Sequence, residues 1–211
     1  MNLVDYRGNQ IKIIKEIKNN SQLAILYPGY RYTLDAPIFF YLQELLAKSN
    51  FDIIGFDYRY SENEYFLNST DEEKKAWFQY DCNAIGRVVN DFSKTYRRLL
   101  YIGKSLGTTV LMNQLKNNLI QGNSEIIYLT PGAEAQEIYL TIQKSKNRTL
   151  IIYGTADKFY NKTYIDFIKD KTNVHFKEIK NAGHVFEEEG NIRQSILNIA
   201  DVIDSIYEFI K

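Results

Sequence analysis

A serine between two glycines is the first feature of this chain that could do chemistry. Residues Gly103–Gly107 read GKSLG and fit the pattern G-x-S-x-G, in which the serine occupies a sharp turn between a strand and a helix. An apolar run, Leu99–Ile102, precedes the pattern, and a helical pattern follows it. Ser105 is therefore predicted to be a nucleophile for acyl transfer. The amide of Leu106, in the first turn of that helix, is predicted to face a developing oxyanion.

A serine hydroxyl needs a base within hydrogen-bond reach, and the chain has only two histidines. His175 lies inside an apolar run, Val174–Ile179, that reads as a strand, where a packed or surface histidine is the better interpretation. His184 follows the same run in a loop, and loops at the carboxyl ends of parallel strands collect residues that handle ligands. His184 is the predicted base.

Two carboxylates compete to orient that histidine. The motif usually has its acid between the serine and the histidine in chain order, and both candidates meet this condition. Asp157 lies just past the run Leu150–Tyr153, after a short turn of small residues. Glu134 follows the preceding run and falls at the start of a helical pattern. Asp157 is favoured, and Glu134 stays the competitor.

Short apolar runs alternate with longer helical patterns along the chain, and this order is typical of a parallel sheet flanked by helices. The first twenty residues read as an antiparallel hairpin at the sheet edge, formed by Leu3–Tyr6 and Ile11–Ile17. The predicted parallel strands are Leu23–Tyr27, Asp52–Asp57, Leu99–Ile102, Glu125–Leu129, Leu150–Tyr153 and Val174–Ile179.

The helical patterns differ in how they begin. The first starts from Asp35 as N-cap, with Pro37 in its first turn. Four more are predicted at 72–92, 105–118, 135–143 and 162–168. A terminal helix is expected to pack one isoleucine face on the sheet, formed by Ile192, Ile196, Ile199, Ile203, Ile206 and Ile210.

Composition narrows the function classes. The 26 basic and 26 acidic residues cancel, and no basic stripe suits a nucleic acid. Cys82, the only cysteine, excludes an internal disulfide and reads as a buried filler. No run of about 20 apolar residues suits a membrane, and no leader pattern is present, so a cytoplasmic location is expected. Without a linker, residues 1–211 are expected to form a single domain.

With these residues the chain resembles the α/β-hydrolase superfamily over nearly its whole length, and in particular its small bacterial serine hydrolases without a cap. Ser105, Asp157 and His184 stand in the order of that family. The turn Tyr27–Tyr30 stands where the family forms its oxyanion hole, so the resemblance implies the backbone N–H of Tyr30 as a second donor beside that of Leu106.

The resemblance implies an α/β-hydrolase fold with a mostly parallel sheet of about seven to eight strands and helices on both faces. Many members carry a cap after the strand that here ends at Leu129, but only Thr130–Glu134 precede the next helix, so no cap domain is expected. Lys104 departs from the residues that the family often has before its nucleophile.

The function implied is that of a serine hydrolase that cleaves an ester or thioester of a small, openly accessible acyl substrate through an acyl-enzyme intermediate, with no metal and no organic cofactor. A non-catalytic ligand- or partner-binding module of the same fold, and a small peptidase or amidase, are the alternatives. The sequence does not determine the oligomeric state.

Residues near the predicted strand ends could shape the substrate site. Arg31 could pair with a substrate carboxylate, although a solvated arginine is an equally good interpretation. The segment Ser61–Thr70 reads as a surface loop that could partly cover the site. An aromatic acyl pocket is possible from Tyr30, Tyr32, Tyr58, Tyr60, Phe159 and Phe186.

Overall fold

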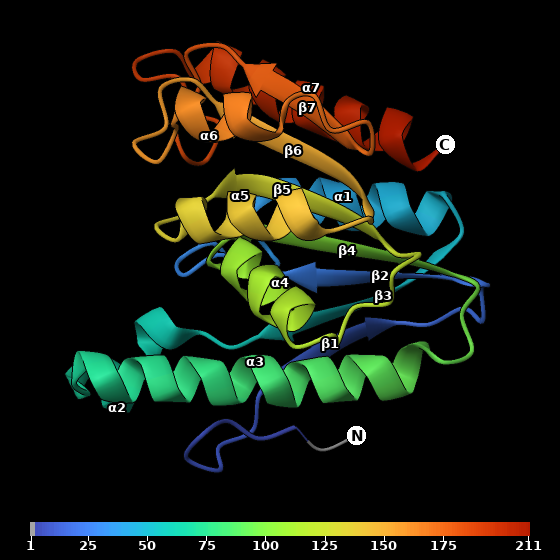
Figure 1. Ribbon diagram of the computed structural model, residues 1–211, viewed down its shortest axis with the longest axis vertical. Coiled ribbons are helices and arrows are strands. Elements are labelled where there is room, and N and C mark those ends of the chain that lie inside the picture. Colours follow the sequence, from blue (N-terminus) through green and yellow to red (C-terminus); the bar gives the residue numbers. More distant parts are fainter. Residues whose placement is uncertain (1–2) are drawn as a thin grey trace.

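A computed structural model describes residues 3–211, which build one seven-stranded sheet with the order β1-β3-β2-β4-β5-β6-β7 (Figure 1). Only β1 runs antiparallel to its neighbour, and all other pairs are parallel. Each later strand contains the range predicted for it, and the mostly parallel sheet is confirmed. The strands are β1 (Lys12–Glu16), β2 (Gln22–Tyr27), β3 (Phe51–Asp57), β4 (Arg98–Ser105), β5 (Glu125–Pro131), β6 (Arg148–Gly154) and β7 (Val174–Ile179).

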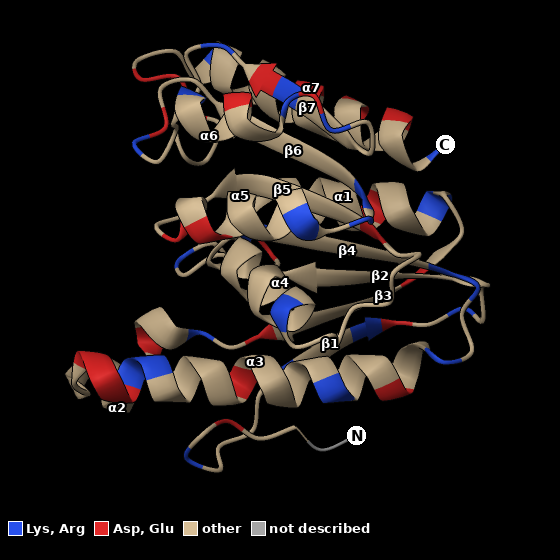
Figure 2. Cartoon of the chain, viewed as in Figure 1, with Lys and Arg blue, Asp and Glu red and all other residues tan. Residues whose placement is uncertain are grey.

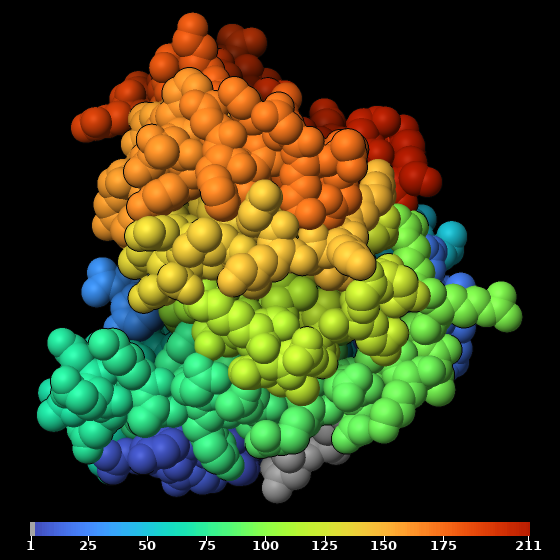
Figure 3. Space-filling model, in the orientation of Figure 1, coloured from blue at the N-terminus to red at the C-terminus, as the bar shows by residue number. Residues whose placement is uncertain are grey.

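Helices cover both faces of the sheet (Figure 1). One face carries α1 (Pro37–Lys48) and α7 (Ile192–Ile210), which contact each other. The other carries α3 (Asp71–Ser93), α4 (Leu106–Lys116), α5 (Ala135–Lys144) and α6 (Lys162–Ile168), and the bands of colour in Figure 3 follow this order across the molecule. No helix within residues 3–211 has both the length and the apolar character to cross a bilayer.

Two hydrophobic cores follow from the alternation of side chains along buried strands. On β2, Leu23, Ile25 and Tyr27 point into the core under α3 and α4, whereas Ala24 and Leu26 point into the core under α1 and α7. Because both faces are covered, the central strands are apolar at almost every position rather than at every second one.

The N-terminal hairpin prediction was wrong in its first half. β1 pairs with β3, but Leu3–Tyr6 forms no strand and contributes only an isolated bridge between Val4 and Gln10. The Asp5 carboxylate accepts hydrogen bonds from the backbone N–H groups of Arg7 and Asn9, at 2.9 and 2.8 Å. These local bonds compete with a strand ladder and favour a tight turn.

Two further predictions need correction, one at the start of α1 and one in the segment before α3. The N-cap of α1 is Ala36 rather than Asp35, and no side chain caps this helix. The segment Ser61–Thr70 is not a plain loop, because it contains part of a 3₁₀ turn (Tyr60–Glu62) and the short helix α2 (Glu64–Asn68). A five-residue helix is too short to give a hydrophobic period, so the pattern could not indicate it.

The isoleucine face of α7 meets the core only in its later turns. Ile192 and Ile196 are 80% and 62% exposed, against the prediction. The six isoleucines have a mean spacing of 3.6 residues and therefore stay on one side of the helix, so the exposure of the first two depends on what packs beside that end of α7 and not on the spacing. The buried residues of α7 are Asn198, Val202, Ile206, Phe209 and Ile210.

Candidate active site

Ser105 occupies a tight turn between β4 and α4. Its backbone has φ 52° and ψ −113°, a conformation that a residue with a side chain rarely adopts. A Cβ at Gly107 would lie 2.0 Å from the carbonyl oxygen of Tyr27, and one at Gly103 would lie 2.5 Å from that of Gly107. The two glycines of the pattern therefore let β2, β4 and α4 approach closely enough to hold the serine in this turn.

The structure brings Ser105, His184 and Asp157 together in one hydrogen-bonded chain. Ser105 Oγ lies 2.8 Å from His184 Nε2, and His184 Nδ1 lies 2.7 Å from Asp157 Oδ2. The side chain of Asp157 is 2% exposed and that of His184 is 24% exposed, so of these two side chains only the imidazole reaches the cavity. Glu134, the competing carboxylate, is exposed at the N-cap of α5 and contacts neither residue by a hydrogen bond within residues 3–211.

The Asp157 carboxylate is fixed from both sides. One oxygen faces His184, and the other accepts a hydrogen bond from the backbone N–H of Phe159 at 2.9 Å. The Phe159 ring in turn packs edge-on against the imidazole, with ring centroids 5.2 Å apart. The carboxylate and the imidazole therefore hold each other in one orientation.

The loops that carry these two residues are joined by their backbones. Ala156 N–H donates to the carbonyl of Ala182 at 3.0 Å, and Asn181 N–H donates to Thr155 Oγ1 at 2.8 Å. This approach requires a glycine at the end of β6, because a Cβ on Gly154 would lie 2.1 Å from the Ala182 oxygen. Parallel pairing of β6 and β7 thus delivers the acid and the histidine to the same edge.

Lys104 is a fully buried lysine directly before the nucleophile. Its ammonium donates to the hydroxyl of Thr130 at 3.0 Å and to the backbone carbonyl of His184 at 2.8 Å. It also lies over the rings of Tyr32 and Phe186, at 4.6 and 5.8 Å from their centroids. The lysine therefore connects the end of β4 to the loop that carries the histidine, a contact that the sequence did not indicate.

Burial lowers the pKa of Lys104 from 10.5 to about 7, because the apolar surroundings disfavour the charged ammonium. The negative charges of Asp157 and Glu187 act in the opposite direction but do not offset the burial. Near neutral pH the group thus lies between its charged and neutral forms.

Two backbone amides border the nucleophile. Leu106 is the first residue of α4, where N–H groups have no intrahelical partner. The turn after β2 is closed by Gly29 N–H donating to the Tyr32 carbonyl at 2.9 Å, and within residues 3–211 the Tyr30 N–H donates to no protein oxygen. Tyr30 and Leu106 both line the cavity that holds Ser105.

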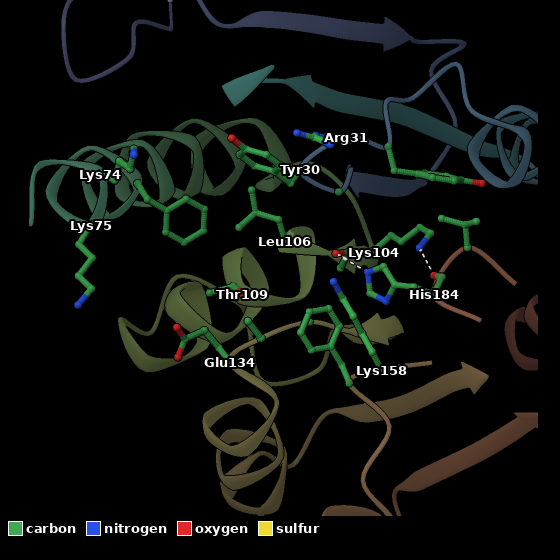
Figure 4. A pocket seen from close by; sticks show the side chains of 18 residues that line it. Tyr30, Arg31, Lys74, Lys75, Lys104, Leu106, Thr109, Glu134, Lys158 and His184 are labelled. Atoms are coloured by element: carbon green, nitrogen blue, oxygen red, sulfur yellow. Dashed lines mark hydrogen bonds between the residues drawn. The ribbon is translucent and has the colours of Figure 1, made fainter. Parts of the chain in front are cut away.

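This cavity has a volume of about 610 Å³ and opens at the carboxyl edge of the sheet (Figure 4). Three of the six aromatic residues predicted for a pocket line it, namely Tyr30, Tyr32 and Phe159. The other three, Tyr58, Tyr60 and Phe186, are buried in the hydrophobic cores.

The segment Ser61–Thr70 does not border the cavity, so the cover expected from it is absent. The beginning of α3 borders it instead, with Lys74, Lys75 and Phe78. The sequence also gave no reason to select Lys158, a further lining residue, apart from its place directly after Asp157. In the described part of the chain, His, Cys, Asp and Glu side chains form no group of three that could hold a metal ion.

Comparison with known proteins identifies the family to which this fold belongs. A family model described as an alpha/beta hydrolase domain matches residues 29–211, which include all five predicted site residues. The chain belongs to the alpha/beta hydrolase family. No curated protein sequence matches it.

Solved structures share the alpha/beta hydrolase fold at low sequence identity. Est1E from Butyrivibrio proteoclasticus, determined with bound ferulic acid, has a TM-score of 0.73 and 15% identity, covering 99% of this chain and 97% of its own. The esterase Pf2001 from Pyrococcus furiosus has a TM-score of 0.71 and 16% identity, covering 100% of this chain and 90% of its own. In this chain only Gly132–Glu134 separate β5 from α5, which leaves no room for a cap domain after that strand.

Proposed function

We propose that this alpha/beta hydrolase is a serine esterase or thioesterase that acts on small acyl substrates through an acyl-enzyme intermediate. Ser105 is the nucleophile, His184 the general base and acid, and Asp157 the residue that orients the imidazole. The observation that carries the proposal is the unbroken contact from Ser105 Oγ through His184 to Asp157, at 2.8 and 2.7 Å. A serine and a base at this separation fit the geometry that nucleophilic catalysis requires.

In the proposed reaction, Ser105 Oγ attacks the carbonyl carbon while its proton passes to His184 Nε2. Asp157 accepts the Nδ1–H bond and stabilises the imidazolium that forms. The backbone N–H groups of Tyr30 and Leu106 donate to the oxyanion, and each such donor typically lowers the barrier by about 3 kcal/mol. The imidazolium then gives its proton to the leaving alcohol or thiol. Water next attacks the acyl-enzyme while His184 takes its proton, and the proton returns to Ser105 as the carboxylic acid leaves.

The strained backbone of Ser105 favours this function over a non-catalytic binding module. A binding module has no need for a serine at φ 52°, whereas a nucleophile benefits when the turn pushes its hydroxyl into the cavity. Ester or thioester substrates are preferred to peptides because the cavity is open and, within residues 3–211, it is bordered only by the sheet edge and its helices, with no further element to hold a chain terminus. The esterases among the structural neighbours support the same choice.

A fluorophosphonate probe tests the nucleophile directly. We expect covalent labelling of the wild-type protein and none of Ser105→Ala, with hydrolysis of p-nitrophenyl acetate and of a thioester measured beside it. Ser205→Ala is the matched control, because this serine lies on α7 outside the cavity and, in the described chain, its hydroxyl bonds only to Asp201 of the same helix. A folded wild-type protein that is neither labelled nor active would contradict the proposal.

A further inference from the structure

The walls of the cavity carry an excess of positive charge that the protein as a whole does not have. The chain has 26 basic and 26 acidic residues. The cavity, in contrast, is lined by Glu134 as its only acidic residue among those described, and by the basic residues Arg31, Lys74, Lys75, Lys104 and Lys158. Lys104 is buried and bound to protein oxygens, so the other four are the cations that a substrate could meet.

Three of these four cations lie near acidic residues. Lys74 and Lys75 follow directly on an acidic first turn of α3, as the adjacent red and blue segments in Figure 2 show. Arg31 also borders a second cavity, whose lining includes Asp57 and Glu62, and both of these carboxylates already pair with Arg59. These cations therefore give a weaker attraction to an anion than their number indicates.

Lys158 differs from them in its place and in its surroundings. It immediately follows Asp157, and in Figure 4 its side chain extends toward His184, whereas Lys74 and Lys75 lie at the other end of the cavity on α3. Like Arg31, Lys74 and Lys75, it forms no ion pair within residues 3–211, but its ammonium lies 4.9 Å from the centroid of the Phe159 ring, which packs against the imidazole of His184. The adjacent Asp157 carboxylate is already occupied by His184 and by the Phe159 amide.

Beside these charges the cavity has an apolar lining that includes Tyr30, Leu106, Phe78 and Val185. Such a wall suits the carbon chain of an acyl group, and an unpaired ammonium suits an anionic end. We propose that the substrates of this esterase are esters that carry a free carboxylate, and that Lys158 binds this carboxylate. The inference rests on the proposed function, because it places the scissile carbonyl at Ser105.

Two isosteric esters test the charge preference. The p-nitrophenyl monoester of adipic acid ends in a carboxylate, and the p-nitrophenyl ester of adipamic acid ends in a neutral amide of the same shape. We expect wild-type kcat/KM to favour the anionic ester by about ten-fold at low salt, the effect of one charge-assisted hydrogen bond. Raising the salt concentration from about 20 mM to about 0.5 M should reduce this ratio.

Three variants decide whether Lys158 is responsible. Lys158→Gln should bring the ratio to about one, and Glu134→Gln should raise it, because it removes a negative charge from the same wall. Lys146→Gln, an exposed lysine that lines a different cavity, should leave the ratio unchanged. A wild-type ratio of one or less, or a preference that survives in Lys158→Gln, would overturn the inference.

A binding measurement separates this inference from the proposed function. Ser105→Ala protein is titrated with adipamate and with neutral adipamide, followed by NMR. Tighter binding of adipamate, lost in the double variant with Lys158→Gln, supports the carboxylate site even if no ester is hydrolysed. Equal binding of the two amides overturns the site even if the protein is an active esterase.

Discussion

Replacing Lys104 by Met should remove a specific part of the pH dependence of stability. The pKa of Lys104 is lowered from 10.5 to about 7 by burial, a difference worth about 5 kcal/mol between the charged and neutral forms. At a pH between these two pKa values, Lys104 binds a proton in the unfolded chain but not in the folded chain. The free energy of unfolding therefore rises with pH. From pH 6 to pH 9 this lysine increases the free energy of unfolding by about 3 kcal/mol.

The assay is urea denaturation of the wild type and of Lys104→Met at pH 6 and at pH 9, followed by circular dichroism. Other buried groups titrate in the same range, such as Asp81, whose pKa burial raises to about 7. Their contribution is common to both proteins and cancels in the difference. We expect the wild type to gain about 3 kcal/mol more than the variant over this interval. Lys146→Met, at an exposed position, is the control and should behave as the wild type.

An equal pH dependence in the wild type and in Lys104→Met would refute this reasoning. It would mean that the ammonium is solvated, or that the oxygens of Thr130 and His184 stabilise the charged form enough to offset the burial. If the free energy of unfolding rose more steeply with pH in the variant than in the wild type, the predicted direction of the effect would be wrong. Met is a suitable replacement because its unbranched side chain fits between the same aromatic rings without a charge.

Two further predictions concern the site and its scaffold. Asp157→Asn should lower kcat by about 10⁴-fold while Glu134→Gln has little effect on the hydrolysis of neutral esters, and the reverse ranking in a steady-state assay would show that the other carboxylate orients the histidine. Gly107→Ala should reduce the free energy of unfolding by about 2 kcal/mol or more, because its Cβ would lie 2.0 Å from the Tyr27 oxygen. Gly122→Ala, where nothing lies within 4 Å, is the control in urea denaturation, and equal losses in the two variants would contradict the steric argument.

The sequence by itself determined the sheet and the nucleophile candidate. Runs of apolar residues reveal parallel strands because both faces of such a sheet are buried, and no alternation is needed. The pentapeptide around Ser105 reveals its turn because only glycine fits where backbones approach so closely. With two histidines in the chain, position after a strand was enough to select His184.

Only the tertiary structure decided which side chains reach the imidazole. Asp157 and Glu134 both follow strands, and the turn of small residues before Asp157 favoured it without showing that either carboxylate lies beside His184. The distinction comes from the backbone bonds between the loops after β6 and β7, which form across 26 residues of sequence between Thr155 and Asn181. Local propensities do not encode such contacts.

The environments of Lys104 and Lys158 were likewise invisible in the sequence. Both are lysines beside a predicted site residue, yet one is fully buried and bound to the histidine loop, and the other is exposed at the cavity. The isoleucines of α7 show the same limit, since their spacing predicted a helix but not which turns the core would cover. Solvent exposure depends on what the rest of the chain packs against a residue, and this is decided only when the whole sheet and its helices are assembled.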